Sequence, residues 1–414
     1  MFVSHRTEVM MSKIAPTLSW TMKLIEVEDT TLTGNVPTLK ELLEKNTTSA
    51  DTFVAPSVVD SSKELASIMC SSGTTGVPKG VALSHQNLLY MILNSSKYDY
   101  FDIRRDDRLL LFLPLFHSYA FCMLMSGISA NSTIYIMRSF NLDTLMKVVD
   151  NCKITHVPIV PPVLLSLAKN PALLNYDFSS VRELICGAAP LPRDVGEEVK
   201  KRTKVKYIRN GYGMTELAVA AAVSDRTLDD DNVGVLMPDL IGKVVDPSTG
   251  VVLGPGQVGE ICFKGRQTMM GYYDNPKATA ETIDQDNWLH TGDLGCYNKN
   301  GIFYITGRLK ELIKYKGFQV SPSEIEMVIQ SHPCVKDAAV IGKPHEINGE
   351  VPTAFVVKQP DSTVTVTEIL EFANKHLSPQ KWLRGGVHFV DSIPKTPSGK
   401  ILRMKLQLST MSKH

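Results

Sequence analysis

Short apolar runs alternate with longer amphipathic stretches through the middle of the chain. Runs of four or five mostly apolar residues predict buried strands, and stretches with apolar residues three or four positions apart predict helices between them. The predicted strands lie at 109–113, 133–137, 156–159, 183–186 and 206–209, and the clearest predicted helices lie at 142–152 and 193–201. Because strands that alternate with helices are typical of parallel sheets, we expect an α/β fold with helices on the faces of the sheet.

The pattern changes at Val233, where short alternating strands separated by turn sequences predict a β-rich subdomain over 233–306. Beyond it lies a compact α/β module of about a hundred residues, an ordinary domain size. The helices and strands predicted in this module are 323–331, 338–341, 353–357 and 366–376. We therefore expect a large domain at 1–306 and a small α/β domain at 307–414.

The first 65 residues carry the weakest pattern. Alternation at 22–27 predicts a strand, which a helix follows, and the polar, Thr-rich segment 46–62 predicts an exposed linker.

Composition excludes several classes of function. The chain has 414 residues and a net charge of +1, so bulk electrostatics do not favour nucleic acid or an anionic membrane as a partner. The seven cysteines are scattered singly without a CxxC pair, which suits a reducing compartment and suggests neither a zinc site nor a disulfide framework.

One uncharged stretch, 109–130, is nearly long enough to cross a bilayer. Pro114, His117 and Ser118 interrupt it, so we interpret it as a strand, a loop and a buried helix. The N-terminus lacks the apolar core of a secretory signal.

The most distinctive segment is the glycine-rich loop 71–80, Ser-Ser-Gly-Thr-Thr-Gly-Val-Pro-Lys-Gly. Glycines let backbone N–H groups approach an anion, hydroxyls donate hydrogen bonds, and Lys79 adds a positive charge, so the loop suits a polyphosphate. It is not a Walker loop, because Pro78 and Gly80 stand where that loop requires Gly and Ser or Thr. Strands at 66–70 and 81–83 would hold the loop at the carboxyl end of a parallel sheet. Without the motifs that follow it, the loop sequence would be interpreted as a surface linker.

Further signals follow in a fixed order. His117 ends a hydrophobic strand, and small residues at 187–190 end another, where a planar ring could lie on the backbone. The segment 210–216 is predicted as one glycine-flexed turn that presents an aromatic ring, a hydroxyl and a carboxylate. Asp293 offers a carboxylate suited to two ribose hydroxyls. Lysine-rich and glycine-rich segments complete the series at 306–319 and 394–400.

Taken together, these motifs resemble the adenylate-forming superfamily of acyl-CoA synthetases, and are most similar to its 4-coumarate:CoA ligase and firefly luciferase-like branch. The resemblance runs from near the N-terminus to the end of the chain. It implies that a carboxylic acid attacks the α-phosphate of ATP to form an acyl-adenylate. The C-terminal domain then rotates, and the thiol of coenzyme A displaces AMP.

The resemblance also implies roles by position. The segment from Ser71 to Lys79 would bind the β- and γ-phosphates and Thr215 the α-phosphate, while Glu216 would hold Mg²⁺. Tyr212 would pack on adenine, and Asp293 and Arg308 would hold the ribose. The other residues expected at the ATP or coenzyme A sites are Ser72, Gly73, Thr74, Thr75, Gly187, Ala188, Gly211, Gly213, Lys310, Lys316, Gly317 and Gln319.

Three residues are expected to act in catalysis. Lys400 would contact both the carboxylate and the phosphate during adenylation. Lys314 would serve thioester formation, and His117 would stand at the entrance of the acyl pocket. Either Gly307, where close relatives often have Asp, or Lys310 would be the hinge between the two domains.

Departures from the family pattern leave alternatives open. The family has a longer N-terminal segment, so the large domain is expected to be truncated and the chain could be a catalytically inactive, nucleotide-binding paralogue. A luciferase-like oxygenase is the other alternative, although Ser118 and Ala188 differ from the beetle enzymes and favour ordinary ligation.

The acid stays open between cinnamate-type and fatty acids. We expect a monomer located in the cytosol or, from the final Ser-Lys-His, in peroxisomes.

Overall fold

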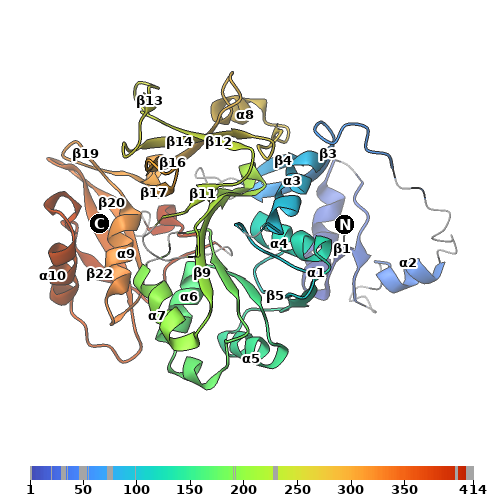
Figure 1. Ribbon diagram of the computed structural model, residues 1–414, viewed down its shortest axis with the longest axis horizontal. Coiled ribbons are helices and arrows are strands. Elements are labelled where there is room, and N and C mark those ends of the chain that lie inside the picture. The colour runs from blue at the N-terminus through green and yellow to red at the C-terminus, as the bar shows by residue number, and fades with distance from the viewer. Residues whose placement is uncertain are drawn as a thin grey trace. The chain divides into compact units, whose positions relative to one another are not determined.

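The computed structural model forms two compact units, Met1–Val59 and Asp60–His414 (Figure 1). The structure describes residues 2–19, 21–28, 34, 36–45, 54, 56–71, 78–97, 99–189, 191, 193–226, 232–396 and 400–406. The boundary between the units falls inside the polar segment that the sequence predicts as a linker.

The first unit contains two short parallel strands, β1 (Phe2–Val3) and β2 (Ile25–Glu26). Its helices are α1 (His5–Ile14), followed by a 3₁₀ turn at Ala15–Thr17, and α2 (Leu39–Lys45). The predicted strand and helix correspond to β2 and α2, whereas β1 and α1 were not predicted.

The second unit is built around a seven-stranded sheet in the order β11-β10-β9-β8-β7-β5-β6. Its strands from β5 to β9 pair in parallel, as predicted, and β10 and β11 extend one edge antiparallel. The bounds are β5 (Arg108–Leu111), β6 (Thr133–Ile136), β7 (His156–Ile159), β8 (Glu183–Cys186), β9 (Tyr207–Met214), β10 (Val219–Val223) and β11 (Val235–Leu236).

Helices cover both faces of this sheet because successive strand residues point to opposite sides. Leu109 and Leu111 of β5 pack with residues of α3 (His85–Ser95) and α4 (Ser118–Ser129). Leu110 between them packs with residues of α5 (Leu142–Cys152), α6 (Pro161–Lys169) and α7 (Arg193–Thr203). A 3₁₀ turn at Pro171–Asn175 follows α6.

The uncharged stretch 109–130 forms β5, a loop and α4, as predicted. None of the helices that the structure describes is long and apolar enough to span a bilayer. Helix α3 begins with a capping box, in which Asn87 N–H donates to Ser84 Oγ at 3.2 Å and Ser84 N–H donates to Asn87 Oδ1 at 2.8 Å.

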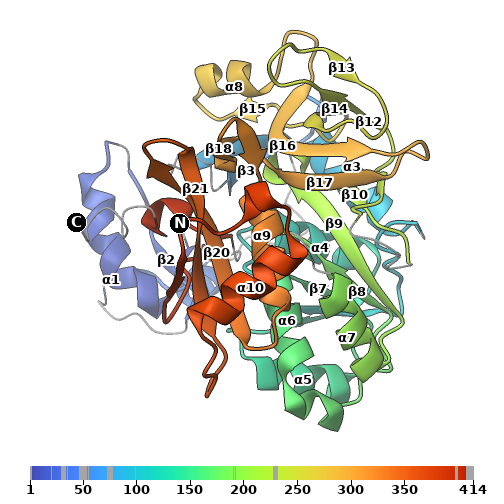
Figure 2. The same ribbon diagram turned by 90° about the vertical axis from the view of Figure 1, so that its left-hand side faces the viewer.

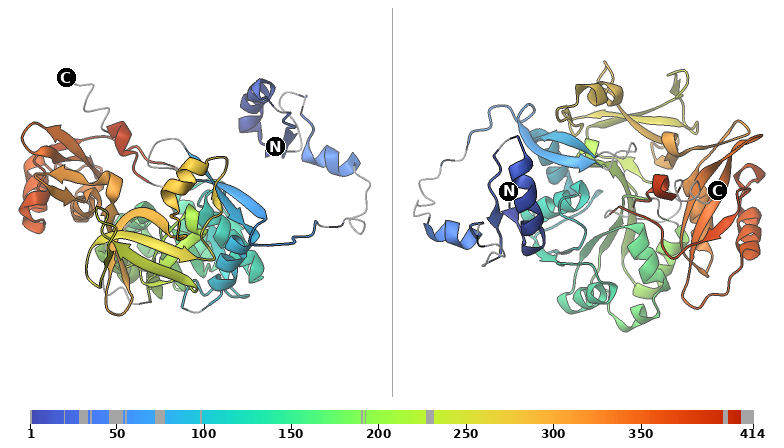
Figure 3. Two further views of the ribbon diagram at one scale, coloured as in Figure 1. Left: turned by 90° about the horizontal axis from the view of Figure 1, so that it is seen from above. Right: turned by 180° about the vertical axis from the view of Figure 1, so that it is seen from behind.

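The glycine-rich loop connects two antiparallel strands, β3 (Leu65–Ser71) and β4 (Lys79–Ser84). With β15 (Gly271–Tyr272) they form a separate three-stranded sheet, seen from behind in the right-hand view of Figure 3. The predicted place at the carboxyl end of a parallel strand is therefore wrong. A strand direction depends on pairing partners, which the apolar runs do not specify, and β3 is mostly solvent-accessible rather than buried.

The predicted β-rich subdomain is an antiparallel sheet in the order β13-β12-β14-β16-β17. Its strands are β12 (Leu240–Val245), β13 (Val252–Leu253), β14 (Gly259–Gly265), β16 (Leu289–Tyr297) and β17 (Phe303–Arg308), with helix α8 (Pro276–Thr282) between β15 and β16.

A second α/β sheet occupies the C-terminal part, with the strand order β19-β18-β21-β20 and β22 parallel to β21. Helices α9 (Pro322–Ser331) and α10 (Val366–His376) pack on one face of it (Figure 2). Ile393 and Leu406 pack against the opposite face. The strands are β18 (Ile313–Tyr315), β19 (Phe318–Val320), β20 (Val335–His345), β21 (Gly349–Lys358) and β22 (Val387–Phe389), with 3₁₀ turns at Leu309–Glu311 and Pro379–Lys381.

Candidate active site

Asp293 joins two other predicted site residues. It lies on β16, directly opposite Arg308 on β17. Arg308 Nε donates to Asp293 Oδ1 at 2.9 Å, and the Tyr212 hydroxyl donates to Asp293 Oδ2 at 2.7 Å. Burial raises the pKa of the Asp293 carboxyl, while Arg308 and Tyr212 oppose that rise. The carboxylate is therefore fixed by partners from two other strands.

Tyr212 lies in the extended strand β9, so the predicted glycine-flexed turn is wrong. Gly213, next to Tyr212, does not form a turn. A Cβ on Gly213 would lie 1.6 Å from the carbonyl oxygen of Val219 on β10. Gly213 thus permits close approach of two strands. The Tyr212 ring packs against Phe263, with centroids 6.2 Å apart.

Thr215 and Glu216 follow in a 3₁₀ turn, Thr215–Leu217. Thr215 Oγ1 lies 3.3 Å from Ser118 Oγ, and Glu216 Oε1 accepts from the Tyr272 hydroxyl at 2.8 Å. Lys79 Nζ stands 4.5 Å from the centroid of the same Tyr272 ring. Tyr272 therefore links the predicted metal carboxylate to the predicted phosphate lysine, a role that sequence analysis missed.

Ser71 and Lys79 are the described residues at the two ends of the glycine-rich loop, and they lie opposite each other in the β3–β4 register. Ser71 Oγ is buried and has no hydrogen-bond partner among the described residues. Ser72, Gly73, Thr74 and Thr75 lie outside the described residues.

Small residues line the end of β8, as predicted. A Cβ on Gly187 would lie 3.4 Å from the Gly211 carbonyl oxygen and 3.7 Å from the Tyr119 ring, so the two backbones approach closely. Ala188 has a φ of +74°, in the left-handed region that favours glycine. Ala188 therefore holds a backbone conformation that is strained for a residue with a side chain.

His117 is the N-terminal cap of α4, where its Nδ1 accepts from the backbone N–H of Tyr119 at 3.4 Å. Burial lowers the pKa of His117, and the positive charge of Lys400 lowers it further. Both effects favour the neutral imidazole.

Lys400 lies within electrostatic range of Arg308, Asp293 and Glu216. Burial lowers the pKa of its ammonium, Arg308 lowers it further, and the two carboxylates raise it. The backbone of Lys400 is tied to Thr396, because Lys400 N–H donates to Thr396 Oγ1 at 3.1 Å and Thr396 N–H donates to the Lys400 carbonyl oxygen at 2.8 Å. The structure thus brings Lys400 to the residues predicted to bind ATP.

The predicted thioester residues lie elsewhere on the C-terminal sheet. Lys314 on β18 is exposed, and its backbone N–H donates to Glu350 Oε2 at 2.8 Å. Gln319 on β19 lies opposite Lys314, and Lys316 and Gly317 form the tight turn between these strands with positive φ values of 46° and 82°. Lys310 lies in the 3₁₀ turn between β17 and β18. Among the described residues, no hydrogen bond or ion pair joins the Lys314 ammonium to the group around Lys400.

Comparison with known proteins shows the family of the chain. The family model described as AMP-binding enzyme matches residues 3–273, and the model described as AMP-binding enzyme C-terminal domain matches residues 324–400. The chain belongs to the AMP-binding enzyme family. This AMP-binding enzyme is 40% identical over 409 residues to the 4-coumarate–CoA ligase-like 9 protein of Arabidopsis thaliana, covering 98% of this chain and 73% of the relative.

Two further relatives extend the comparison. A 4-coumarate–CoA ligase of Vanilla planifolia is 40% identical over 399 residues, covering 93% of this chain and 71% of the relative. The ATP-bound crystal structure of MatB from Rhodopseudomonas palustris superimposes with a TM-score of 0.84 at 28% identity, covering 99% of this chain and 78% of that one. The AMP-binding enzyme is therefore an AMP-forming acid–thiol ligase that uses ATP and coenzyme A.

Proposed function

We propose that this enzyme activates a cinnamate-type carboxylic acid as its acyl-adenylate and transfers the acyl group to coenzyme A. The observation that supports the proposal is the position of Lys400, which is partly buried and lies within electrostatic range of Asp293, Arg308 and Glu216. The relatives named 4-coumarate–CoA ligase support an aromatic acid of this class over a fatty acid.

The nucleotide would bind along the line of residues from β16 to β4. Asp293 and Arg308 would hold the ribose, with Tyr212 packed on the adenine, and Thr215 would donate to the α-phosphate. Ser71 and Lys79 would bind the outer phosphates together with the loop between them. The Ser71 hydroxyl, which has no partner among the described residues, supports this, since a buried donor without a partner is costly unless a ligand accepts its hydrogen bond.

Glu216 is the residue best suited to hold Mg²⁺ here. Its carboxylate offers the hard oxygen ligands that Mg²⁺ prefers, and Tyr272 fixes it by donating to Oε1. When bound, the ion would neutralise charge on the leaving pyrophosphate.

In the first half-reaction, an oxygen of the substrate carboxylate bonds to the α-phosphorus as the bond to the pyrophosphate oxygen breaks. Negative charge spreads over the α-phosphate oxygens, and the Lys400 ammonium would stabilise it. Donors placed where charge develops are typically worth about 3–4 kcal/mol, or two to three decades of rate.

The second half-reaction forms the thioester. The sulfur of coenzyme A attacks the acyl carbon, the thiol proton passes to solvent, and the bond to AMP breaks. His117, at the acyl end of the site, would position the acyl group. Lys314, Lys316, Gly317 and Gln319 share one exposed hairpin that would meet the acyl-adenylate and the pantetheine after the C-terminal part rotates about Gly307 or Lys310.

A pyrophosphate-release screen tests the proposal. The full chain is incubated with ATP, Mg²⁺, coenzyme A and either cinnamate, 4-coumarate or fatty acids of increasing length. We expect release with the cinnamates, and CoA thioester formation in equal amount. Release confined to fatty acids would overturn the acid class, and no release with any acid would favour an inactive nucleotide-binding protein.

Lys400→Ala provides the matched control for that screen. We expect the variant to lose pyrophosphate release by roughly two to three decades while it still converts a supplied cinnamoyl-adenylate to the thioester. Unchanged release would remove Lys400 from the mechanism. Equal loss of both half-reactions would indicate a structural role instead.

A further inference from the structure

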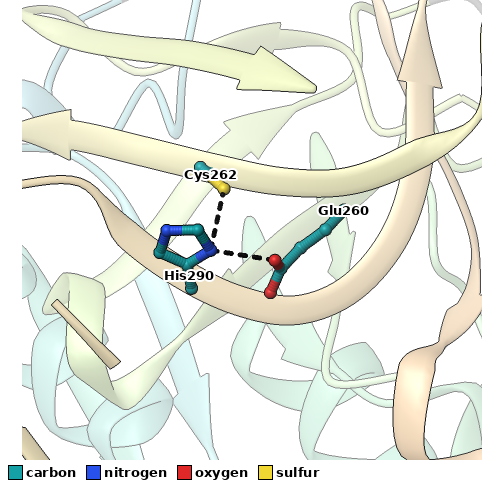
Figure 4. Close-up of side chains that lie close together, drawn as sticks. All are labelled: Glu260, Cys262 and His290. Atoms are coloured by element: carbon teal, nitrogen blue, oxygen red, sulfur yellow. Dashed lines mark hydrogen bonds and ion pairs between the residues drawn. The ribbon is translucent and has the colours of Figure 1, made fainter. Parts of the chain in front are cut away.

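Three potential metal ligands converge on the β-rich sheet. Glu260 and Cys262 lie two residues apart on β14, so both side chains point to the same face. His290 lies on the neighbouring strand β16, directly opposite Cys262 in the register. Figure 4 shows the three side chains directed toward one another.

The distances among the donor atoms are close to those around a bound ion. His290 Nδ1 lies 2.9 Å from Glu260 Oε2 and 3.4 Å from Cys262 Sγ, and the three donor atoms lie within 4.8 Å of one another. Zinc with bonds of about 2.0–2.3 Å in a tetrahedral arrangement separates its ligand atoms by about 3.3–3.6 Å. A small outward rotation of the Glu260 carboxylate would complete that spacing.

A second carboxylate orients the imidazole. Asp284 Oδ2 lies 3.4 Å from His290 Nε2, on the opposite side of the ring from Cys262. If Asp284 accepts the proton on Nε2, the lone pair of Nδ1 faces the oxygen of Glu260 and the sulfur of Cys262. Carboxylates that orient a metal-binding histidine in this way are common second partners of zinc sites.

Burial divides the cluster into a closed side and an open side. Cys262 is fully buried, the Glu260 side chain is 12% exposed, and the His290 side chain is 32% exposed. An ion held by these three ligands would reach solvent past the imidazole, which leaves room for a water as fourth ligand.

We propose that Glu260, Cys262 and His290 form a binding site for a borderline-soft divalent metal, with Zn²⁺ as the preferred ion and Asp284 as the residue that orients His290. A set of one sulfur, one nitrogen and one carboxylate oxygen suits Zn²⁺ and Co²⁺ and disfavours Mg²⁺ and Ca²⁺. This site is separate from the Mg²⁺ proposed at Glu216.

The site is connected to the nucleotide residues through one carboxylate. Glu260 Oε1, the oxygen that does not face His290, accepts from the backbone N–H of Gly292 at 3.0 Å. Gly292 directly precedes Asp293, so an ion on Oε2 would fix the same carboxylate that holds the Asp293 segment. Metal binding at this site would therefore restrict the position of Asp293, the carboxylate proposed to bind the ribose.

Titration of the untagged, metal-free full chain with Co²⁺ tests the proposal. We expect one equivalent to bind with the visible spectrum of a tetrahedral site and a thiolate-to-cobalt charge-transfer band, and Zn²⁺ to displace it. Cys262→Ser should abolish the charge-transfer band, and Asp284→Ala should weaken binding by about 10- to 100-fold. Cys296→Ser, on the same strand as His290, is the matched control and should keep the band.

Two results would overturn the site. One is the absence of one-to-one binding by the folded wild-type chain. The other is a charge-transfer band that persists in Cys262→Ser or disappears in Cys70→Ser, which removes the exposed thiol. If Cys262→Ser fails to fold, as judged by its thermal melt, His290→Gln replaces it and must weaken Co²⁺ binding at least tenfold.

Discussion

The ammonium of Lys400 occupies a site that is less hydrated than a protein surface, and its strongest charged neighbour is the cation Arg308. Both conditions lower the pKa of Lys400, and Asp293 and Glu216 only partly compensate. A lysine that must be positive to stabilise phosphate charge is thus held where it gives up its proton more readily than an exposed lysine.

This shift predicts an alkaline limit for adenylation. Because the folded pKa of Lys400 is lowered, its charged form is lost at a lower pH than for an ordinary lysine, so kcat/KM for pyrophosphate release should fall as pH rises through that value. Acyl transfer from supplied adenylate should lack this decline. The measurement is both half-reactions across alkaline pH, and Lys400→Arg should shift the decline to higher pH. Identical profiles for the two half-reactions would contradict the assignment.

Individual residues were predictable from the sequence where a motif marks them, but their partners were not. Asp293 and Arg308 could be proposed as ribose ligands, yet nothing along the chain showed that Tyr212 donates to the same carboxylate. Tyr272 was missed because it lies 56 residues from Glu216 and belongs to no motif. Its pairing beside β4 depends on sheet geometry, which local patterns do not encode.

At the scale of elements, the junction between β17 and α9 is unusually close. Gly307 on β17 pairs with Leu294 on β16. A Cβ on Gly307 would lie 2.6 Å from the Oγ of Ser321, the N-terminal cap residue of α9. The glycine therefore permits the contact of these two elements in the orientation that places Lys400 at the site.

Gly307→Ala should disfavour that orientation. Overpacking of this kind costs about 1–3 kcal/mol, so adenylation should fall roughly tenfold or more while acyl transfer is retained. Ser321→Gly removes the opposing atom at a capping cost of only a few tenths of a kcal/mol, and the double variant should recover adenylation. Pyrophosphate exchange and acyl transfer are measured separately for the three variants. A parallel decline in both rates, unrelieved by Ser321→Gly, would exclude the hinge at this position.

Element boundaries were predictable where an apolar run has polar or glycine neighbours. Strand β7 and helix α5 match their predicted residues, and α10 does also. The extended conformation of residues 210–214 was not predictable from the sequence. Glycines here suggest a turn, but in the structure the missing side chain of Gly213 lets the backbone of β10 approach closely.

At the scale of the whole molecule, Lys169 joins the large α/β region to the C-terminal sheet. Its ammonium, at the end of α6, donates to the carbonyl oxygens of Val335 and Gln330, the latter at 3.5 Å. Burial lowers the pKa of Lys169. These contacts belong to the orientation in which Lys400 lies beside Asp293.

Lys169→Met should weaken that orientation while it keeps the apolar stem of the side chain. We expect adenylation to fall by about one to two decades with little change in acyl transfer, because a hydrogen bond from a charged donor contributes about 1.5–3 kcal/mol. The exposed Lys147→Met on α5 is the control and should change neither rate. Equal effects of the two substitutions would show that Lys169 does not stabilise this orientation.

The separate sheets of the β-rich and C-terminal parts were predictable from the changes in hydrophobic pattern near Val233 and Gly307. The contact made by Lys169 was not, since a single lysine at a helix end is indistinguishable in sequence from a solvated one.

The described residues that flank Lys400 are anchored to the C-terminal sheet, to helix α9 and to the turn before β18. Lys395 pairs with Ile401 and forms an ion pair with Asp337 of β20 at 2.6 Å, and Arg403 binds Glu311 and Glu326. Lys314 belongs to the same sheet, whereas His117 and Ala188 precede it in the chain. One contiguous stretch of chain thus holds both proposed catalytic lysines, and a chimera joined at 309–312 would exchange both lysines between relatives without exchanging His117, which is proposed to meet the acid.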